Sequence, residues 1–245
     1  KDGLPKKVVR LFTGKDDIYK ISQKYGDDYY VNSNHKLVLQ SQNLRMKNTV
    51  GEYIIPTVLE WMDLSKKTTY SRAFSGIKNT VSLQFEKQDI LIDPYLLGLW
   101  LGDGYSSKPG LIVNKTKDVE IIEFITNKDW GQPFSIKEKE PERYSDEMVS
   151  VLFRNSGVFK QDNVFYNNLR KYNLIKNKHI PDNYIYNTTE VRLNLLAGLI
   201  DTDGTYNRKR QCYEISSKDL KFVNQIKLLC TTLGIYSSIR EVFSK

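Results

Sequence analysis

The chain has 245 residues, and 37 lysine and arginine residues against 29 aspartate and glutamate residues give it a formal charge of +8. This length can bury a hydrophobic core, and 40% hydrophobic with 27% charged residues excludes wholesale disorder. No apolar run approaches the roughly 20 residues that cross a bilayer, and the start lacks a signal peptide, so we expect an intracellular protein in the cytoplasm or a nucleus, not a secreted or membrane protein. Two cysteines are too few for a disulfide framework. The positive charge favours a partner with a phosphate backbone.

The first ninety residues predict a β-rich domain. Short β-type runs occupy residues 7–12, 18–22, 29–31 and 36–39, and turn-forming residues such as Gly26-Asp27 separate them. Residues 56–63 predict a short helix, and the alternation over residues 81–85 predicts another strand. We therefore expect one domain over residues 1–90 and a second over residues 91–245.

The second domain contains two matched helices about a hundred residues apart. Asp93 as N-cap and Pro94 at the first helical position predict the start of the first helix, which ends at Asp103-Gly104. The second helix follows a capping box at residues 187–190 and ends at Asp203-Gly204. In each copy we expect two strands, another helix and a strand to follow. The pattern predicts an α+β fold of two pseudo-symmetric halves, residues 91–186 and 187–245.

Each matched helix ends on an aspartate, where the negative end of the helix dipole favours a cation. Gly98 and Gly198 occupy the same place in the two helices, so the helices can pack closely and bring Asp103 and Asp203 together. Paired carboxylates with nearby carbonyl oxygens make a site suited to Mg²⁺. The alternative is that the glycines serve packing and that each Asp-Gly pair is a plain turn.

Residues 96–104 (LLGLWLGDG) and 196–204 (LAGLIDTDG) resemble the paired motifs of LAGLIDADG homing endonucleases. This resemblance, which covers residues 91–245, implies two αββαββα halves, the second incomplete, whose sheets form a saddle over a long asymmetric target in double-stranded DNA. It implies a monomer in which Asp103 and Asp203 bind the Mg²⁺ that cleaves both strands, assisted by the backbone carbonyls of Gly102 and Thr202.

Several basic residues are candidates for contact with DNA. The sequence Lys178-His179-Ile180-Pro181 matches the setting in which this family places a basic catalytic residue, so Lys178 is the candidate; the alternative is a solvated lysine. Basic residues near the strands after the two aspartates are expected to neutralise phosphates. They are Lys108, Lys115, Arg208, Lys209 and Arg210.

The β-rich start resembles the N-terminal splicing (Hint) part of inteins. Residues 32–39 (NSNHKLVL) are similar to the second intein block, with Asn32 in place of the usual Thr, as in inteins of the yeast vacuolar-ATPase type. The resemblance implies that His35 destabilises the scissile peptide of a host precursor in cis, with Asn32 and Asn34 beside it. The chain starts at Lys1 and lacks a terminal His-Asn pair, so we expect no splicing from this chain alone.

Two other functions stay open. The chain could be a cleavage-inactive LAGLIDADG protein, such as an RNA-splicing maturase or a DNA-binding regulator. It could also be a free-standing or intron-encoded endonuclease with an unrelated β extension. The presence of both Asp103 and Asp203 favours cleavage, because binding alone does not require two carboxylates that face phosphates.

Overall fold

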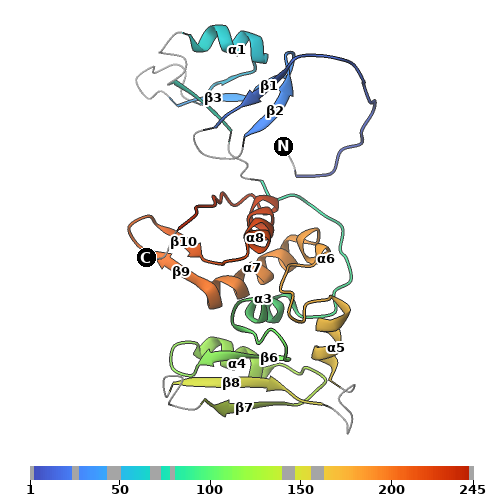
Figure 1. The fold of residues 1–245 in the computed structure, drawn as a ribbon, viewed down its shortest axis with the longest axis vertical. Helices are drawn as coiled ribbons and strands as arrows, with labels where there is room; N and C mark the ends of the chain where they lie inside the picture. Colours follow the sequence, from blue (N-terminus) through green and yellow to red (C-terminus); the bar gives the residue numbers. More distant parts are fainter. Residues whose placement is uncertain are drawn as a thin grey trace. The chain divides into compact units, whose positions relative to one another are not determined.

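The computed structural model describes residues 3–23, 28–42, 51–66, 73–77, 81–139, 147–155 and 163–242, and the turn expected at Gly26-Asp27 lies outside them. The chain divides into two compact units of mixed α and β structure (Figure 1). The larger unit comprises Lys1–Pro5 and Val81–Glu241, and the smaller unit comprises Lys6–Thr80 and Val242–Lys245. Within the described residues, no helix is long and apolar enough to span a bilayer.

The smaller unit contains two small antiparallel sheets and a helix. Its elements are β1 (Ile18–Ile21), β2 (Tyr29–Asn32), β3 (Leu39–Ser41), β4 (Tyr53–Ile54), α1 (Val58–Ser65) and β5 (Phe74–Gly76). Strand β1 pairs with β2, and β3 lies between β4 and β5. Thr57 caps α1 because its hydroxyl accepts from the Glu60 N–H (3.3 Å) while the Glu60 carboxylate accepts from the Thr57 N–H (2.7 Å).

The strand expected over residues 7–12 is not formed. Val9 and Leu11 are 94% and 84% exposed, and the segment pairs with no other strand among the described residues. A β-type run becomes a strand only when a neighbouring strand takes up its backbone hydrogen bonds, and sequence alternation does not supply that neighbour. The run at residues 36–39 likewise becomes a strand only from Leu39, although Lys36 makes a single bridge with Thr57.

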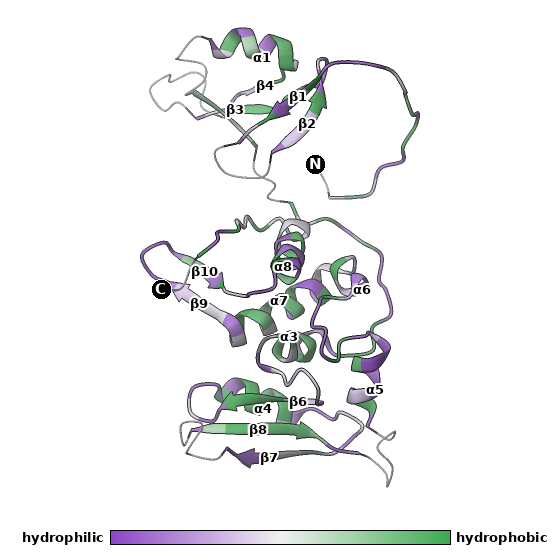
Figure 2. Cartoon of the chain, viewed as in Figure 1, coloured by the Kyte–Doolittle hydropathy of each residue, from purple (hydrophilic) through white to green (hydrophobic). Residues whose placement is uncertain are grey.

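The larger unit is built around two helices, α3 and α7. Its elements are α3 (Pro94–Asp103), β6 (Gly110–Asn114), α4 (Val119–Asn127), β7 (Phe134–Glu138), β8 (Met148–Phe153), α5 (Val164–Lys171), α6 (Asp182–Ile185), α7 (Thr189–Asp203), β9 (Gly204–Asn207), β10 (Cys212–Ile215) and α8 (Leu220–Thr232). One sheet has the antiparallel order β6-β8-β7, and β9 pairs with β10 in a separate hairpin. Helix α3 is apolar along most of its length (Figure 2), because Leu97, Leu99 and Trp100 are fully buried in the core.

The predicted start of the first matched helix is confirmed, and that of the second is not. The Asp93 carboxylate accepts from the Leu96 N–H (3.0 Å), and Asp118 and Asp219 are the N-caps of α4 and α8. Helix α8 buries an apolar face that includes Phe222, Ile226 and Leu229. The capping box at residues 187–190 is wrong, because Thr188 is the N-cap of α7. Asn187 is buried instead, and its amide group bonds the backbone of Gln88.

Residues 81–90, which we expected in the first domain, group with the larger unit. The strand expected at residues 81–85 is not formed, because its backbone bonds partners outside any sheet. The Leu83 N–H donates to the Thr232 carbonyl (2.8 Å) at the end of α8, and the guanidinium of the buried Arg192 donates to the carbonyls of both Leu83 and Thr232. A buried cation therefore ties this segment to α7 and α8.

The two halves of the larger unit share their order only in part. After α7, the strand β9 pairs with β10 from Gly204 opposite Ile215. After α3, the corresponding glycine, Gly104, forms a single bridge with Leu111, and β6 is the only strand between α3 and α4. The complete αββαββα order is formed by neither half within the described residues.

Candidate functional site

Helices α3 and α7 pack with almost no space between their backbones. A Cβ atom added to Gly98 would lie 2.4 Å from the Leu195 carbonyl oxygen and 2.9 Å from the Gly198 Cα. A Cβ atom added to Gly198 would in turn lie 2.4 Å from the Tyr95 carbonyl oxygen. Only glycine fits at both positions, so the predicted close approach of the two helices is confirmed. The Tyr95 hydroxyl also donates to the Asp201 carboxylate across the interface (2.7 Å).

The same packing brings the C-terminal ends of the two helices together. A Cβ atom on Gly102 would lie 2.0 Å from the Thr202 hydroxyl oxygen and 3.5 Å from the carboxylate carbon of Asp203. Asp103 follows Gly102 directly, and each aspartate is the last helical residue before a glycine. Two carboxylates therefore meet where two helix dipoles also place negative charge.

Lys178 extends to this junction from the loop before α6. Its ammonium group donates to the Gly102 carbonyl (2.8 Å) and lies 5.3 Å from the centre of the Trp100 ring. The loop is fixed on both sides, because the Lys176 N–H donates to the Ser106 carbonyl (2.6 Å) and the Ile180 N–H donates to the side chain of Gln225 (3.0 Å). The structure thus places Lys178 beside both aspartates.

The charges of this cluster perturb one another. Burial, together with the charge of Asp203, raises the pKa of the Asp103 carboxyl, and burial also raises the pKa of Asp203. The ammonium of Lys178 opposes both shifts. Burial lowers the pKa of Lys178 itself to about 8, although both carboxylates attract its positive charge. The positive charge of the half-buried Lys178 only partly offsets the repulsion between the two neighbouring carboxylates, so a further cation would lower their raised pKa values.

The donor set fits a hard divalent cation. Two carboxylates and helix-end carbonyl oxygens are ligands that Mg²⁺ prefers, and the raised pKa values of the aspartates would fall when a dication binds. Within the described part of the chain, no group of three or more His, Cys, Asp or Glu side chains is placed to hold a metal. The two aspartates are therefore the acidic donors of this cluster. The Gly102 carbonyl already accepts from Lys178, which leaves one of its lone pairs for a metal.

The predicted DNA-contacting residues lie on the two hairpin regions, and some are engaged in ion pairs. Lys115 pairs with Glu138 (2.9 Å) and Arg210 pairs with Glu214 (3.1 Å). Lys108 is exposed with its ammonium 5.9 Å from the ring of Tyr105. Arg208 and Lys209 are exposed in the turn between β9 and β10.

Sequence reasoning missed the open face of the sheet β6-β8-β7. The buried residues of β6 and β8 (Leu111, Val113, Val149 and Val151) point to the core, so the alternate positions face away from it. The register pairs Ser150 with both Ile112 and Lys137, which puts Lys137 on this open face. Lys139, two residues later, and Arg154, which donates to Ser135 (2.8 Å), add two more cations. Alternation within β7 could have identified Lys137, but only the register shows which face it shares.

The candidate splicing residues lie together in the smaller unit. Asn32 ends β2, Asn34 lies in the following turn, and the side chains of both are exposed, as is that of His35. The His35 N–H donates to the Asn32 carbonyl (3.2 Å), and the Ser33 hydroxyl donates to the Asp16 carboxylate (3.0 Å). The turn therefore has a defined backbone and presents an accessible imidazole.

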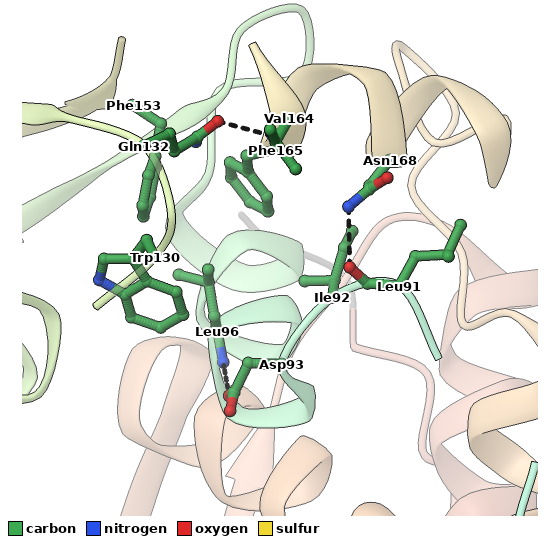
Figure 3. A pocket seen from close by; sticks show the side chains of 10 residues that line it. All are labelled: Leu91, Ile92, Asp93, Leu96, Trp130, Gln132, Phe153, Val164, Phe165 and Asn168. Atoms are coloured by element: carbon green, nitrogen blue, oxygen red, sulfur yellow. Dashed lines mark hydrogen bonds between the residues drawn. The ribbon is translucent and has the colours of Figure 1, made fainter. Parts of the chain in front are cut away.

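A small cavity of about 80 Å³ lies beside the N-terminal end of α3 (Figure 3). The polar groups around it bond one another, since Gln132 accepts from the Phe165 N–H (3.1 Å) and Asn168 donates to the Leu91 carbonyl (2.8 Å). Ten helical residues, roughly 15 Å, separate this end of α3 from Asp103. The cavity is a packing void and not part of the site.

Comparison with known proteins identifies the domain that carries α7 and Asp203. Residues 190–245 match the LAGLIDADG-like domain family. The matched region begins in α7 and includes Asp203, β9, β10 and α8. LAGLIDADG proteins bind DNA, and their domains are typically nucleases that use divalent metals. The match supports a LAGLIDADG family member.

Two curated relatives share a larger part of the chain. It is 31% identical over 162 residues to the replicative DNA helicase DnaB of Mycobacterium intracellulare, an alignment that covers 66% of this chain and 23% of that protein. It is 31% identical over 157 residues to the ATP-dependent DNA helicase Hel308 of Thermococcus kodakarensis, covering 60% of this chain and 13% of that protein. The chain thus spans less than a quarter of the length of either relative.

Proposed function

We propose that the larger unit is a metal-dependent homing endonuclease that cuts both strands of a specific DNA duplex. The observation that carries this proposal is the junction of α3 and α7, where glycine packing brings Asp103 and Asp203 together beside Lys178. A pure binding protein gains nothing from two neighbouring carboxylates that face phosphates. A phosphodiesterase needs them, because they hold the cation that such chemistry requires.

Each residue of the cluster has a distinct task. Asp103 and Asp203, with the carbonyls of Gly102 and Thr202, would hold Mg²⁺, which when bound polarises a phosphoryl oxygen and makes a water more nucleophilic. Lys178, fixed on the Gly102 carbonyl, places a positive charge where negative charge accumulates on the phosphate. Its pKa of about 8 leaves it mostly protonated at neutral pH.

The two halves favour an asymmetric duplex target. The first half presents a three-stranded sheet with Lys137, Lys139 and Arg154 on its open face. The second half presents the β9-β10 hairpin, whose turn carries the exposed cations Arg208 and Lys209. One chain carries both halves, so a monomer on a long asymmetric site is the simplest assembly.

We further propose that the endonuclease is inserted in an intein, whose N-terminal splicing part includes the smaller, β-rich unit. Two differently named helicases share a segment of about the same size with this chain, and the segment is a small part of each. No GxxxxGK[ST] phosphate-binding sequence occurs in the 245 residues. The similarity is therefore better explained by an element carried within different host proteins. His35, exposed in its turn, would act on the scissile peptide of the precursor with Asn32 and Asn34 beside it.

The endonuclease proposal is tested on a plasmid that carries the proposed target. This target is made by joining the two genomic sequences that flank the coding region of this chain, with the coding region itself left out. With Mg²⁺ the wild-type protein should linearise this plasmid, and Asp103→Asn and Asp203→Asn should each reduce the rate by at least about a hundredfold, since several kcal/mol of stabilisation are lost. Both variants should still bind the joined duplex in EDTA. Binding without cutting by the wild type would favour a maturase or regulator, and equal cutting by the variants would refute the metal site.

Splicing is tested in a precursor with the natural flanks on both sides. His35→Ala should block release of the N-terminal flank, whereas Lys36→Ala, next in the chain and equally exposed, should not. Normal release with His35→Ala would contradict the splicing assignment and leave the endonuclease proposal intact.

A further inference from the structure

Tyr105 lies on the open face of the sheet β6-β8-β7, two residues after Asp103. Its backbone N–H donates to the Gly110 carbonyl (2.9 Å), which directs the chain back toward β6. Its hydroxyl donates to the Ser150 hydroxyl (3.0 Å) in the central strand. Ser150 is only 5% exposed although its side chain is on the open face, which agrees with coverage by the tyrosine.

Two lysines approach the same phenol ring from different parts of the chain. The Lys139 ammonium donates to the Tyr105 hydroxyl (3.0 Å) and lies 5.3 Å from the ring centre. The Lys108 ammonium lies 5.9 Å from that centre. The resulting chain of hydrogen bonds runs from Lys139 through Tyr105 to Ser150, in which the phenol oxygen both accepts and donates.

These hydrogen bonds restrain the Lys139 side chain. A lysine side chain loses rotamer entropy when it binds, and a cation that a neighbour already restrains loses less of it. Lys137, on the same face, has no contact with Tyr105 among the described residues. Thr205, which follows Gly204 in the second half, has no aromatic ring to hold a lysine. The device therefore belongs to the first half alone.

We propose that Tyr105 is a positioning residue that presents the Lys139 ammonium to a backbone phosphate of the DNA, near the phosphate that Asp103 serves. The proposal rests on the proposed endonuclease function and deepens it. Lys139 is the group that contacts the phosphate, and Tyr105 acts through it. The phenol ring itself stays against Ser150 and reads no base.

The test is a double-mutant cycle on DNA affinity, measured in EDTA with a fluorescent duplex of the joined genomic flanks. Lys139→Gln should lower the magnitude of the salt slope by about 0.9 and weaken binding about tenfold at low salt, since one phosphate contact is lost. Tyr105→Phe should weaken binding about threefold or more and keep the salt slope, because the cation remains but loses its hydrogen bond to the phenol. In the double variant the tyrosine change should have no further effect.

Lys137→Gln is the matched control, because Lys137 is a lysine of the same open face. Combined with Tyr105→Phe, its effect on affinity should be additive. Ser150→Ala removes the other hydrogen-bond partner of the Tyr105 phenol and tests whether that bond serves only the stability of the fold. This variant should change the melting temperature more than it changes the affinity for DNA. Additive behaviour of Tyr105→Phe with Lys139→Gln, or an unchanged affinity of Tyr105→Phe, would overturn this inference. If the wild type itself shows no salt-dependent binding to this duplex, the proposed function fails instead.

Discussion

Replacing Gly98 by alanine should separate the two central helices. The new Cβ atom would lie 2.4 Å from the Leu195 carbonyl oxygen and 2.9 Å from the Gly198 Cα, whereas ordinary contacts begin near 3.4 Å. Both neighbours are backbone atoms of α7, so no side-chain rotation can relieve the clash. The helices must move apart by about 1 Å, the difference between 2.4 and 3.4 Å.

The cost of this movement exceeds the gain in helix propensity. Alanine stabilises a helix interior by about 1 kcal/mol relative to glycine. A gap of 0.5–1 Å forfeits roughly a quarter to a half of each dispersion contact, and Leu99, Leu195 and Leu199 are all fully buried at or near this interface. Together with overpacking strain of about 1–3 kcal/mol, we expect a net loss of about 2–4 kcal/mol. That loss would lower the melting temperature of the larger unit by about 4–16 °C.

Thermal unfolding followed by circular dichroism and by tryptophan fluorescence measures this loss, because Trp100 lies in the core of the affected helix. Gly14→Ala is the control, since nothing lies within 4 Å of the added atom there. Gly198→Ala should be as destabilising as Gly98→Ala. The double variant should lose less than the sum of the two, because the helices are already separated. A Gly98→Ala variant as stable as the wild type, or more stable, would refute the close crossing of α3 and α7.

Three further predictions concern charged side chains of the larger unit. In EDTA, Asp103→Asn should raise the melting temperature at pH 7, because burial and the charge of Asp203 raise the pKa of Asp103 in the folded protein. The ionised Asp103 carboxylate therefore destabilises the fold above that pKa, and this effect disappears when the carboxyl is protonated. The difference in melting temperature between the variant and the wild type should accordingly shrink toward pH 4. In EDTA, the melting temperature of the wild type should rise relative to that of Lys178→Met as pH increases through about 8 toward 10.5, because the lowered pKa lets the folded protein lose the lysine proton before the unfolded chain does. A constant difference between the two proteins across this range would contradict the lowered pKa of Lys178. Arg192→Leu should destabilise the larger unit by about 3 kcal/mol or more in urea unfolding, because the buried carbonyls of Thr232 and Leu83 lose their donor, while Arg192→Lys should recover part of the loss.

Much of the larger unit could be predicted from local sequence. The start of α3 follows from Asp93 and Pro94, since a carboxylate that accepts from a first-turn N–H and a residue without an N–H are both local devices. The buried face of α8 follows from helical periodicity alone. The meeting of Asp103 and Asp203 could also be inferred, because Gly98 and Gly198 stand at equal distances before them and leave room for close packing.

The remaining features depend on residues that are distant in the chain. Arg192 stands on a helix whose sequence gives no sign that it is buried, and its burial is possible only because carbonyls of residues 83, 187 and 232 converge on it. The same convergence takes Asn187 away from the capping role that its position predicts. In the smaller unit, residues 7–12 have the composition of a strand but no partner among the described residues. Backbone groups and buried polar side chains need hydrogen-bond partners, and these partners are often supplied by residues far away in the chain. The sequence therefore determined the start of α3 and the buried face of α8, whereas only the tertiary structure decided which charges are buried, which strands pair and that Tyr105 holds Lys139.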